Sequence, residues 1–422
     1  MKVSLEKSRL EGKVEVPASK SYTIRALFCA ALASGESEII NPLVCDDTGA
    51  AREVLSSIGA EINTEQGFWK VRGGNLQSPE EPLFCADSAA TLRLMTAVCA
   101  LLPGECRLVT GTSLSRRPVA TLIDAMRQLG VECSCNGEVA PVVVRGGGMK
   151  GGLTELPGNI SSQYITALLI AAPLAGAQVR IRLTSPPESK PYIRMTLQCM
   201  RCFGIKVETF PELSEFLIEP QEYRPARYRV EGDWSSGSYF LGMGSIFGNT
   251  VLQNLDPESI QGDRVILDFL KDMGASVEMS GDKIKLNRSK LKAIQADLSD
   301  AIDLLPTMAV LAALAEGESD FEGIARARIK ESNRVACVKA GLGKMGVEVR
   351  EGEDRLAITG TSPKGAVIDS SNDHRIAMAF SIAGLVVGST AIKGAECVSK
   401  TYPEFWETVR SIGGKVRLEN GQ

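Results

Sequence analysis

The sequence predicts an α/β protein built from six copies of one unit, each organised around a buried helix. Three observations predict this fold. A short apolar–Gly–apolar pattern recurs along the chain, a second series of glycines runs in step with it, and six helical segments are apolar nearly all round.

The first pattern places a glycine after an apolar residue at regular intervals of 71, 74, 70, 72 and 67 residues. A helical pattern precedes each glycine, and residues typical of strands follow it. A glycine in this place fits the C′ position of a helix, where a positive φ turns the chain into the next strand. The six positions are Gly59, Gly130, Gly204, Gly274, Gly346 and Gly413.

The second series of glycines ends segments rich in Ala and Leu, at Gly35, Gly104, Gly176, Gly248, Gly317 and Gly388. A helix without a polar face is a buried helix. An ordinary α/β domain could hold one or two such pairs by chance, but six in register favour repeats. The expected buried segments are 26–33, 92–102, 164–174, 239–246, 304–315 and 376–387.

Composition excludes several classes of function. The 422 residues carry a net charge of -4, so no overall basic field attracts nucleic acid. Eleven Cys and one His, with a single CxxC at Cys199 and Cys202, predict neither a zinc site nor a disulfide framework. We expect small buried thiols in a reducing compartment and no metal. Residues 1–13 show no signal or transit character, and no apolar stretch is long enough to span a bilayer, so a cytoplasmic protein without a membrane partner is expected.

Cations near the starts of the apolar helices point to anionic ligands. Each start carries Ser, Asp or Asn, which can cap a helix. Lys20, Arg25, Arg93 and Arg375 stand among these residues, where a cation opposes the helix dipole and, if buried, needs a partner. A bound anion would meet both needs, because helix N-termini present free N–H groups.

Three further clusters repeat the theme. Arg116 and Arg117 are expected to open the second helix of the second unit, residues 330–334 that of the fifth, and Lys400 the last helix. A run such as Lys330–Glu331 with Arg334 is usually a solvated helical face. Its place beside another anion-suited helix start favours a role in binding.

These residues resemble motifs of the 5-enolpyruvylshikimate-3-phosphate synthase family, and the resemblance spans essentially the whole chain. Each motif alone is modest evidence, whereas the ordered set is specific. The matching segments are 19–27, 92–94 with 117–118, 161–163, 189–192, 328–332, 372–375 and 399–401.

The resemblance implies a fold of two lobes, each with three repeated α/β units around buried parallel helices, an inside-out α/β barrel. One lobe would comprise residues 19–230, and the other would combine 1–18 with 231–422. The active site would lie in the cleft between the lobes, and lobe closure would exclude water from it.

The implied reaction moves the enolpyruvyl group of phosphoenolpyruvate onto the 5-hydroxyl of shikimate 3-phosphate and releases phosphate. It belongs to the shikimate pathway, which leads to chorismate and the aromatic amino acids, and it needs no cofactor. By motif match, Lys20 would contact both substrates and shuttle a proton, and Asp303 would deprotonate the 5-hydroxyl. Glu331 would protonate the methylene carbon and later take a proton back.

The resemblance also assigns binding residues by motif. Arginines suit the carboxylate and phosphate groups because their donors form a planar fork. For shikimate 3-phosphate the residues are Lys20, Ser21, Arg25, Ser161, Ser162, Gln163, Ser189, Tyr192, Asp303 and Lys330. For phosphoenolpyruvate they are Lys20, Ala89, Arg93, Arg117, Gln163, Arg334, Arg375 and Lys400. Asp303 could instead be only a helix cap, and Ser189 and Tyr192 only loop packing.

The chain departs from the family pattern at residues 86–90. Ala89 replaces a glycine whose backbone approaches phosphoenolpyruvate, and Asp87 replaces an asparagine. The Ala89 methyl group would intrude more on a longer ligand, so we expect weak inhibition by glyphosate. The Asp87 carboxylate would weaken phosphoenolpyruvate binding.

Two alternatives stay open at this point. A related transferase acts on UDP-N-acetylglucosamine, but that family usually carries a reactive Cys in the loop before its Arg-Pro, and residues 114–117 hold none. A non-catalytic anion-binding repeat protein would not need Lys20, Asp303 and Glu331 together. The expected partners are small-molecule substrates only, and the chain is expected to be a monomer.

Overall fold

The computed structural model describes residues 1–419, in which 24 strands form six four-stranded sheets. Contacts divide the chain into two units, Ala18–Glu231 and a unit that joins Met1–Pro17 to the chain from Gly232 onward. Each unit holds three of the sheets. The α/β class and the six repeats are confirmed.

All six sheets share one strand pattern, in which a parallel pair at one edge is followed by two antiparallel neighbours. In Ala18–Glu231 the sheets are β14 (Arg227–Arg229), β3 (Gly35–Ile40), β5 (Phe68–Gly73), β4 (Glu61–Glu65); β6 (Leu83–Phe84), β7 (Glu105–Val109), β9 (Val139–Arg145), β8 (Glu132–Asn136); and β10 (Gly152–Leu156), β11 (Val179–Leu183), β13 (Glu215–Ile218), β12 (Glu208–Thr209).

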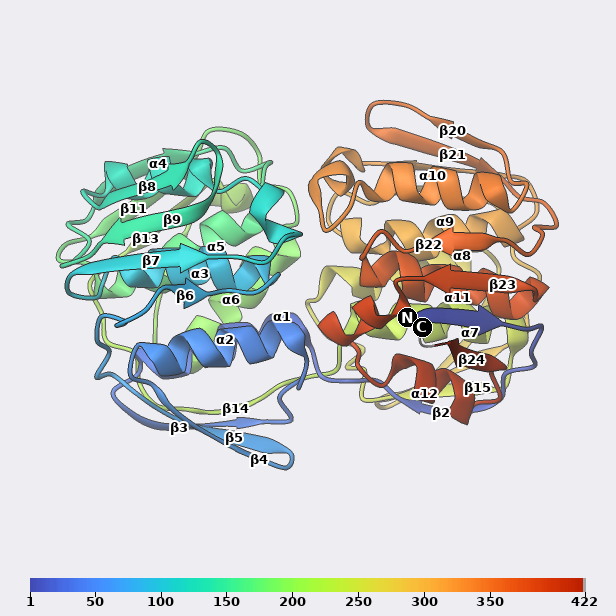
Figure 1. The fold of residues 1–422 in the computed structure, drawn as a ribbon, viewed down its shortest axis with the longest axis horizontal. Helices are drawn as coiled ribbons and strands as arrows, with labels where there is room; N and C mark the ends of the chain where they lie inside the picture. The colour runs from blue at the N-terminus through green and yellow to red at the C-terminus, as the bar shows by residue number, and fades with distance from the viewer. Residues whose placement is uncertain (420–422) are drawn as a thin grey trace. The chain divides into compact units, whose positions relative to one another are not determined.

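The other unit repeats the pattern with strands from both ends of the chain. Its sheets are β2 (Gly12–Glu15), β15 (Thr250–Gln253), β17 (Lys283–Asn287), β16 (Ser276–Ser280); β18 (Gln295–Asp297), β19 (Glu318–Glu322), β21 (Arg355–Thr359), β20 (Val349–Glu351); and β22 (Val367–Asp369), β23 (Thr390–Lys393), β1 (Lys2–Leu5), β24 (Val416–Glu419). Strand β1 pairs with β23 on one side and β24 on the other, and Figure 1 shows it in blue beside the red end of the chain.

The six apolar helices are buried, and each unit has its own hydrophobic cluster around three of them. Helix α3 packs on α5 in one unit, and α9 packs on α11 in the other. These helices are α1 (Lys20–Leu32), α3 (Ala89–Cys99), α5 (Ser162–Ala171), α7 (Trp234–Phe247), α9 (Leu305–Leu314) and α11 (His374–Val387). The outer helices are α2 (Asp46–Ser57), α4 (Ala120–Gln128), α6 (Lys190–Cys202), α8 (Ile266–Asp272), α10 (Arg334–Lys344) and α12 (Phe405–Ser411).

The glycine pattern that predicted the repeats has the expected backbone geometry. All six glycines follow an outer helix and have positive φ, from +80° at Gly130 to +99° at Gly59. An L side chain is strained in this region, so glycine turns the chain toward the next strand at low cost.

The expectation that cationic clusters open the outer helices is wrong for Arg116–Arg117 and for Lys400, and for the 330–334 cluster it holds only at Arg334. Helix α4 begins at Ala120 and α12 at Phe405, after their clusters, whereas α10 begins at Arg334, the last residue of its cluster. Arg116, Arg117 and Lys400 lie in or just after 3₁₀ helices, because Arg117 and Tyr402 precede prolines, which disfavour helical backbone. The 3₁₀ turns are η1 (Leu114–Arg116), η2 (Ala172–Leu174), η3 (Pro211–Leu213), η4 (Gly262–Val265), η5 (Ile302–Leu304), η6 (Ala325–Ile329) and η7 (Ala395–Lys400).

The cysteines are free, and most are buried, as expected of small apolar groups. Cys199 and Cys202 both lie in α6, but Cys202 is exposed. In residues 1–419 no group of His, Cys, Asp and Glu side chains is arranged to hold a metal ion. The same stretch contains no helix with the length and apolar character needed to cross a membrane.

Candidate active site

The starts of the apolar helices are capped by side chains in five cases out of six. Ser19, Ser88, Ser161, Asp233 and Asp373 each accept a hydrogen bond from a backbone N–H of the first turn. The fifth start differs, because η5 and α9 have no side-chain cap hydrogen bond. The Asp303 carboxylate there contacts cations instead, so it is not a helix cap.

Lys20 opens α1 and has a carboxylate partner. Its Nζ lies 2.7 Å from Oδ2 of Asp47, which belongs to the first turn of α2. The Lys20 side chain is 16% exposed and that of Asp47 is 6% exposed. Asp47 thus balances the cation at this helix start.

Arg25 lies in the second turn of α1 and is held by neutral groups. Its guanidinium donates to the Thr196 hydroxyl at 2.9 Å and to the Tyr192 carbonyl at 3.2 Å, both from α6. It also donates to the Ser21 carbonyl at 2.9 Å. Within residues 1–419 no carboxylate lies at ion-pair distance from it, and burial lowers its pKa. The geometry fixes the direction of this cation but leaves its charge without a counter-ion.

Arg93 connects α3 to the start of α5. Its guanidinium donates to Oε1 of Gln163 at 2.5 Å and to the Pro118 carbonyl at 3.3 Å, and it lies 5.0 Å from the centre of the Tyr164 ring. The Tyr164 hydroxyl donates to the same carbonyl at 2.6 Å. Two expected ligand residues, Arg93 and Gln163, are therefore in direct contact.

Arg117 follows η1 in an extended conformation and is 9% exposed. Asp87 anchors this turn, because its Oδ1 accepts a hydrogen bond of 2.9 Å from the Leu114 N–H. The Asp87 carboxylate therefore contributes to local structure as well as to charge. Ala89 is the first residue of α3 and is 5% exposed.

The remaining expected residues of this unit lie at helix starts. Ser21 is in the first turn of α1, Ser161 caps α5, and Ser162 begins α5. Ser189 precedes α6 with a φ of 54°, and its carbonyl accepts from the Tyr192 N–H at 3.0 Å. The Tyr192 ring centre is 5.9 Å from the Arg25 guanidinium carbon.

In the other unit, Arg334 joins three carboxylates. Its guanidinium donates to Asp303 at 2.6 Å, to Glu331 at 2.7 Å and to Asp373 at 2.8 Å. The Arg334 side chain is 1% exposed. These carboxylates raise the pKa of Arg334 despite its burial, so its charge is permanent. The structure thus brings the expected residues Asp303, Glu331 and Arg334 together.

Asp303 is surrounded by cations. Its second oxygen lies 3.1 Å from Arg375, and Lys330 lies 3.6 Å from the first. Burial opposes ionisation, but Arg375, Lys330 and Arg334 outweigh it and hold the pKa of Asp303 well below its usual range. The group is a carboxylate before substrates bind.

Lys330 and Lys400 complete the expected set. Burial is the largest effect on Lys330, and with the neighbouring Arg326 and Arg334 it lowers the pKa of this ammonium to about 8, against the attraction of Asp303. Lys400 ends η7, which packs against α11, and is 9% exposed. His374 is buried beside Asp373, with Nδ1 3.9 Å from its carboxylate.

Three carboxylates in these clusters were missed as site residues from the sequence. Asp47 pairs with Lys20, Asp373 both caps α11 and binds Arg334, and Asp263 in η4 accepts a hydrogen bond from Ser235. Asp373 lies inside the 372–375 motif, so its role could have been predicted from a capping residue next to a cation at the start of an apolar helix. Asp47 resembles an ordinary acidic residue at a helix start, and no feature of the sequence around Asp263 indicates its contact with Ser235.

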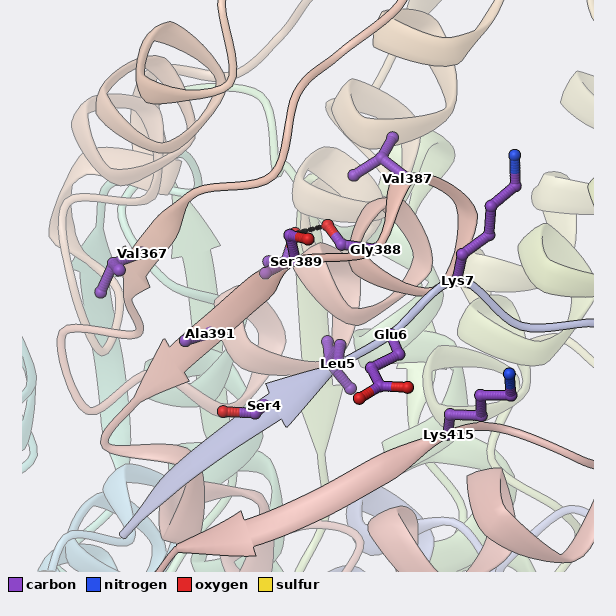
Figure 2. Close-up of a pocket in the computed structure, with 11 residues that line it drawn as sticks. Ser4, Leu5, Glu6, Lys7, Val367, Val387, Gly388, Ser389, Ala391 and Lys415 are labelled. Carbon is purple, nitrogen blue, oxygen red and sulfur yellow. Dashed lines mark hydrogen bonds between the residues drawn. The ribbon is translucent and has the colours of Figure 1, made fainter.

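A surface hollow lies away from these residues. It has a volume of about 600 Å³ and is lined by the chain around β1, the end of α11 and Lys415. Figure 2 shows Lys7 and Lys415 among the residues that line it, and both residues are exposed. None of the expected ligand residues lines it, so we do not take it as the site.

Comparisons with known proteins agree over the whole chain. Residues 5–409 match the family described as EPSP synthase (3-phosphoshikimate 1-carboxyvinyltransferase). A protein of that enzyme name from Dehalococcoides mccartyi is 52% identical over 418 residues, which cover 99% of each chain. Another, from Methanothermobacter thermautotrophicus, is 41% identical and covers 99% of this chain and 100% of its own.

Solved structures share the fold. The EPSP synthase from Acinetobacter baumannii superposes with a TM-score of 0.82 at 26% identity and covers 99% of this chain and 100% of its own. The enolpyruvyl transferase NikO from Streptomyces tendae gives a TM-score of 0.80 at 18% identity, over 100% and 99% of the two chains. At that identity the second likeness concerns the fold alone.

Proposed function

The chain belongs to the EPSP synthase (3-phosphoshikimate 1-carboxyvinyltransferase) family and carries out the enolpyruvyl transfer of the shikimate pathway, and we propose which of its residues do the chemistry. The enolpyruvyl group of phosphoenolpyruvate goes to the 5-hydroxyl of shikimate 3-phosphate, and phosphate leaves. The observation that carries the assignment of residues is the cluster in which Arg334 contacts both Asp303 and Glu331.

Two sets of cations are proposed to bind the substrates. Arg93, Arg117, Arg334, Arg375 and Lys400 hold phosphoenolpyruvate, together with Lys20, Gln163 and the backbone at Ala89. The lack of a carboxylate at ion-pair distance from Arg25 supports a phosphate as its counter-ion, since a buried cation needs one. Shikimate 3-phosphate is held by Arg25, Lys20, Ser21, Ser161, Ser162, Gln163, Ser189, Tyr192, Asp303 and Lys330.

Three groups are proposed to move protons. Asp303 takes the proton of the 5-hydroxyl as its oxygen attacks C2 of phosphoenolpyruvate, while Glu331 protonates the methylene carbon. The resulting tetrahedral adduct loses phosphate, and Glu331 takes back one proton of the new methyl group. Lys20 contacts both substrates and shuttles a proton.

We propose that Asp303 becomes a stronger base when the substrates bind, and the cations around its carboxylate support this. Arg375, Lys330 and Arg334 depress its pKa before substrates bind. When anionic substrates take up part of that positive charge, the carboxylate becomes more basic. The binding of substrates thus prepares the base.

The assignment requires groups from both units, because Arg25 and Ser161 lie in one and Asp303 and Glu331 in the other. We propose that the two units act on one pair of substrates, and that a monomer suffices. The eleven free thiols support a reducing compartment, for which we propose the cytoplasm.

The test is phosphate release from phosphoenolpyruvate with shikimate 3-phosphate as acceptor, and with UDP-N-acetylglucosamine in a parallel reaction. We expect release with shikimate 3-phosphate only. Release with the sugar nucleotide would favour the related transferase, and release with neither would favour a binding protein.

Variants separate the proposed chemistry from binding. Asp303→Asn is expected to lower kcat by about 10²–10⁴-fold, the usual contribution of a general base. Asp268→Asn, a change of an exposed carboxylate on α8, is the matched control and should retain full activity. An Asp303→Asn protein with unchanged kcat would remove Asp303 from the mechanism.

A further inference from the structure

A buried carboxylate without a proposed role lies beside the start of the fourth apolar helix. Asp263 belongs to η4 and is 2% exposed. Its Oδ2 accepts a hydrogen bond from the hydroxyl of Ser235, the second residue of α7. Its Oδ1 is buried and has no hydrogen-bond partner in the described chain. Such an unsatisfied oxygen calls for an explanation, because burying it costs free energy.

The charged groups around Asp263 come from three other elements. Burial has the largest effect on this carboxyl, followed by repulsion from Asp303, attraction to Arg375 and repulsion from Asp233, and the pKa rises to about 6. Turns η4 and η5 and helix α11 all pack against α7, and Arg375 of α11 lies 3.1 Å from the Asp303 carboxylate of η5. The charged residues of α8, Asp268, Lys271 and Asp272, are exposed to solvent.

Asp263 and Asp303 therefore compete for the same cation. Asp303 has the better position, because its carboxylate contacts Arg375, Arg334 and Lys330. Asp263 has only a hydroxyl donor and the more distant charge of Arg375. When two carboxyl groups share a site in this way, one stays ionised and the other readily takes a proton.

We propose that Asp263 is a positioning residue that takes up one proton when an anion binds at Arg375. The inference rests on the proposed function, in which Arg375 holds phosphoenolpyruvate. An anion at Arg375 cancels the attraction that keeps Asp263 ionised, so its carboxylate binds a proton from solvent. The only bond formed is O–H. The neutral carboxyl then leaves Asp303 as the one ionised base beside Arg375.

The sign of the resulting pH dependence follows from linkage. Below the pKa of Asp263 in the free enzyme the carboxyl is already neutral, and binding of phosphoenolpyruvate is at its tightest. Binding weakens as pH rises through that pKa, because a proton must now be taken up. It levels off above the higher pKa of the complex.

The test is the pH dependence of kcat and of KM for phosphoenolpyruvate from pH 5.5 to 8.5, at saturating shikimate 3-phosphate. In the natural protein KM should rise with pH by roughly tenfold for each unit by which the ligand raises the pKa. In Asp263→Asn, which is neutral throughout, this part of the rise disappears, and KM at pH 8 falls below that of the natural protein. Asp268→Asn should follow the natural protein, and the ionisation of phosphoenolpyruvate itself is common to all three.

Two results would overturn the proposal. One is a KM of Asp263→Asn that follows the natural protein across the range. The other is a lower kcat at every pH with an unchanged pH dependence, which a merely structural role would give. If Asp263→Asn does not fold, Ser235→Ala replaces it. Loss of the hydroxyl donor should move the rise in KM to higher pH, and an unmoved curve would contradict the proposal.

A titration with inorganic phosphate separates this inference from the proposed function. Calorimetry at pH 7 in two buffers of different ionisation enthalpy counts the protons taken up without any turnover. The natural protein should take up more protons than Asp263→Asn, by a fraction of one proton per phosphate bound. Equal uptake would contradict the inference, whereas absence of turnover with shikimate 3-phosphate would contradict the proposed function.

Discussion

At the scale of single residues, the buried arginines are held in two different ways. Arg334 and Arg375 contact carboxylates, whereas Arg25 is held by hydroxyl and carbonyl groups. A cation already paired with a carboxylate can exchange part of that pairing for a substrate anion, which alters the basicity of the carboxylate. A cation held only by neutral groups provides direction and charge for an anion without such a change.

Lys330 gives the first prediction at this scale. Because its pKa is lowered to about 8, the ammonium charge is lost as pH rises through 8. KM for shikimate 3-phosphate should then rise by about tenfold per pH unit. Lys330→Arg keeps its charge and should remove this rise up to pH 9. A wild-type KM that stays constant from pH 7 to 9 would contradict the role of Lys330.

Ala89 gives the second prediction at the scale of single residues. Its methyl group stands at the first position of α3, where the expected ligand approaches the backbone. Ala89→Gly should tighten inhibition by glyphosate by at least about tenfold, which is the scale of one methyl group in a close-fitting site. Inhibition constants measured against phosphoenolpyruvate decide this. Nanomolar to low-micromolar inhibition of the natural protein would refute the expectation of weak inhibition.

Single residues also mark the limit of what the sequence predicts. Lys20, Asp303, Glu331 and Arg334 could be found from motifs, and the structure places the last three in contact. Asp47 and Asp263 could not, because each meets its partner through tertiary packing rather than through a short motif.

At the scale of elements, most of the fold could be predicted from the spacing of glycines and from the helices that lack a polar face. The C′ glycines and the apolar helices follow from local physics, a positive φ and the lack of a polar face. The boundaries of the outer helices could not be predicted as well. The clusters before α4 and α12 belong to 3₁₀ turns, because a proline after Arg117 and another after Tyr402 delay the helix.

Helix α10 offers a matched pair of substitutions. A methyl group on Gly341 would lie 2.3 Å from the Phe380 ring of α11, whereas one on Gly343 would meet nothing within 4 Å. Gly343→Ala should stabilise the protein by about 0.5–1 kcal/mol through lower backbone entropy. Gly341→Ala should destabilise it by about 1–3 kcal/mol through overpacking. Midpoints of thermal or urea unfolding measure both, and equal effects would contradict the close contact of α10 with α11.

At the scale of the whole molecule, the first strands of the chain complete sheets formed mainly by its second half. Strand β1 lies between β23 and β24, and β2 pairs with β15. Periodicity along the sequence could not predict these partners, since pairing over some 400 residues leaves no local pattern.

This arrangement predicts how fragments behave. Residues 18–231 should fold alone, whereas 232–422 should not, because they lack β1, β2 and the buried side chains of Val3, Leu5, Val14 and Val16. Burial of each such side chain contributes about 1.5–3 kcal/mol. Joining residues 1–17 after residue 422 through a flexible linker should restore folding. Cooperative unfolding, followed by circular dichroism, is the measurement, and a stable 232–422 fragment would contradict the prediction.

The central claim is that the enolpyruvyl group moves by addition and elimination, with Glu331 giving and then removing a proton. Turnover of phosphoenolpyruvate and shikimate 3-phosphate in D₂O, with the product read by mass spectrometry, tests it most directly. The account predicts deuterium at the vinyl carbon of the product, because a solvent-derived deuteron on Glu331 enters the methyl group before elimination, and it predicts no product with Glu331→Gln. A product free of deuterium, or full turnover by Glu331→Gln, would contradict it.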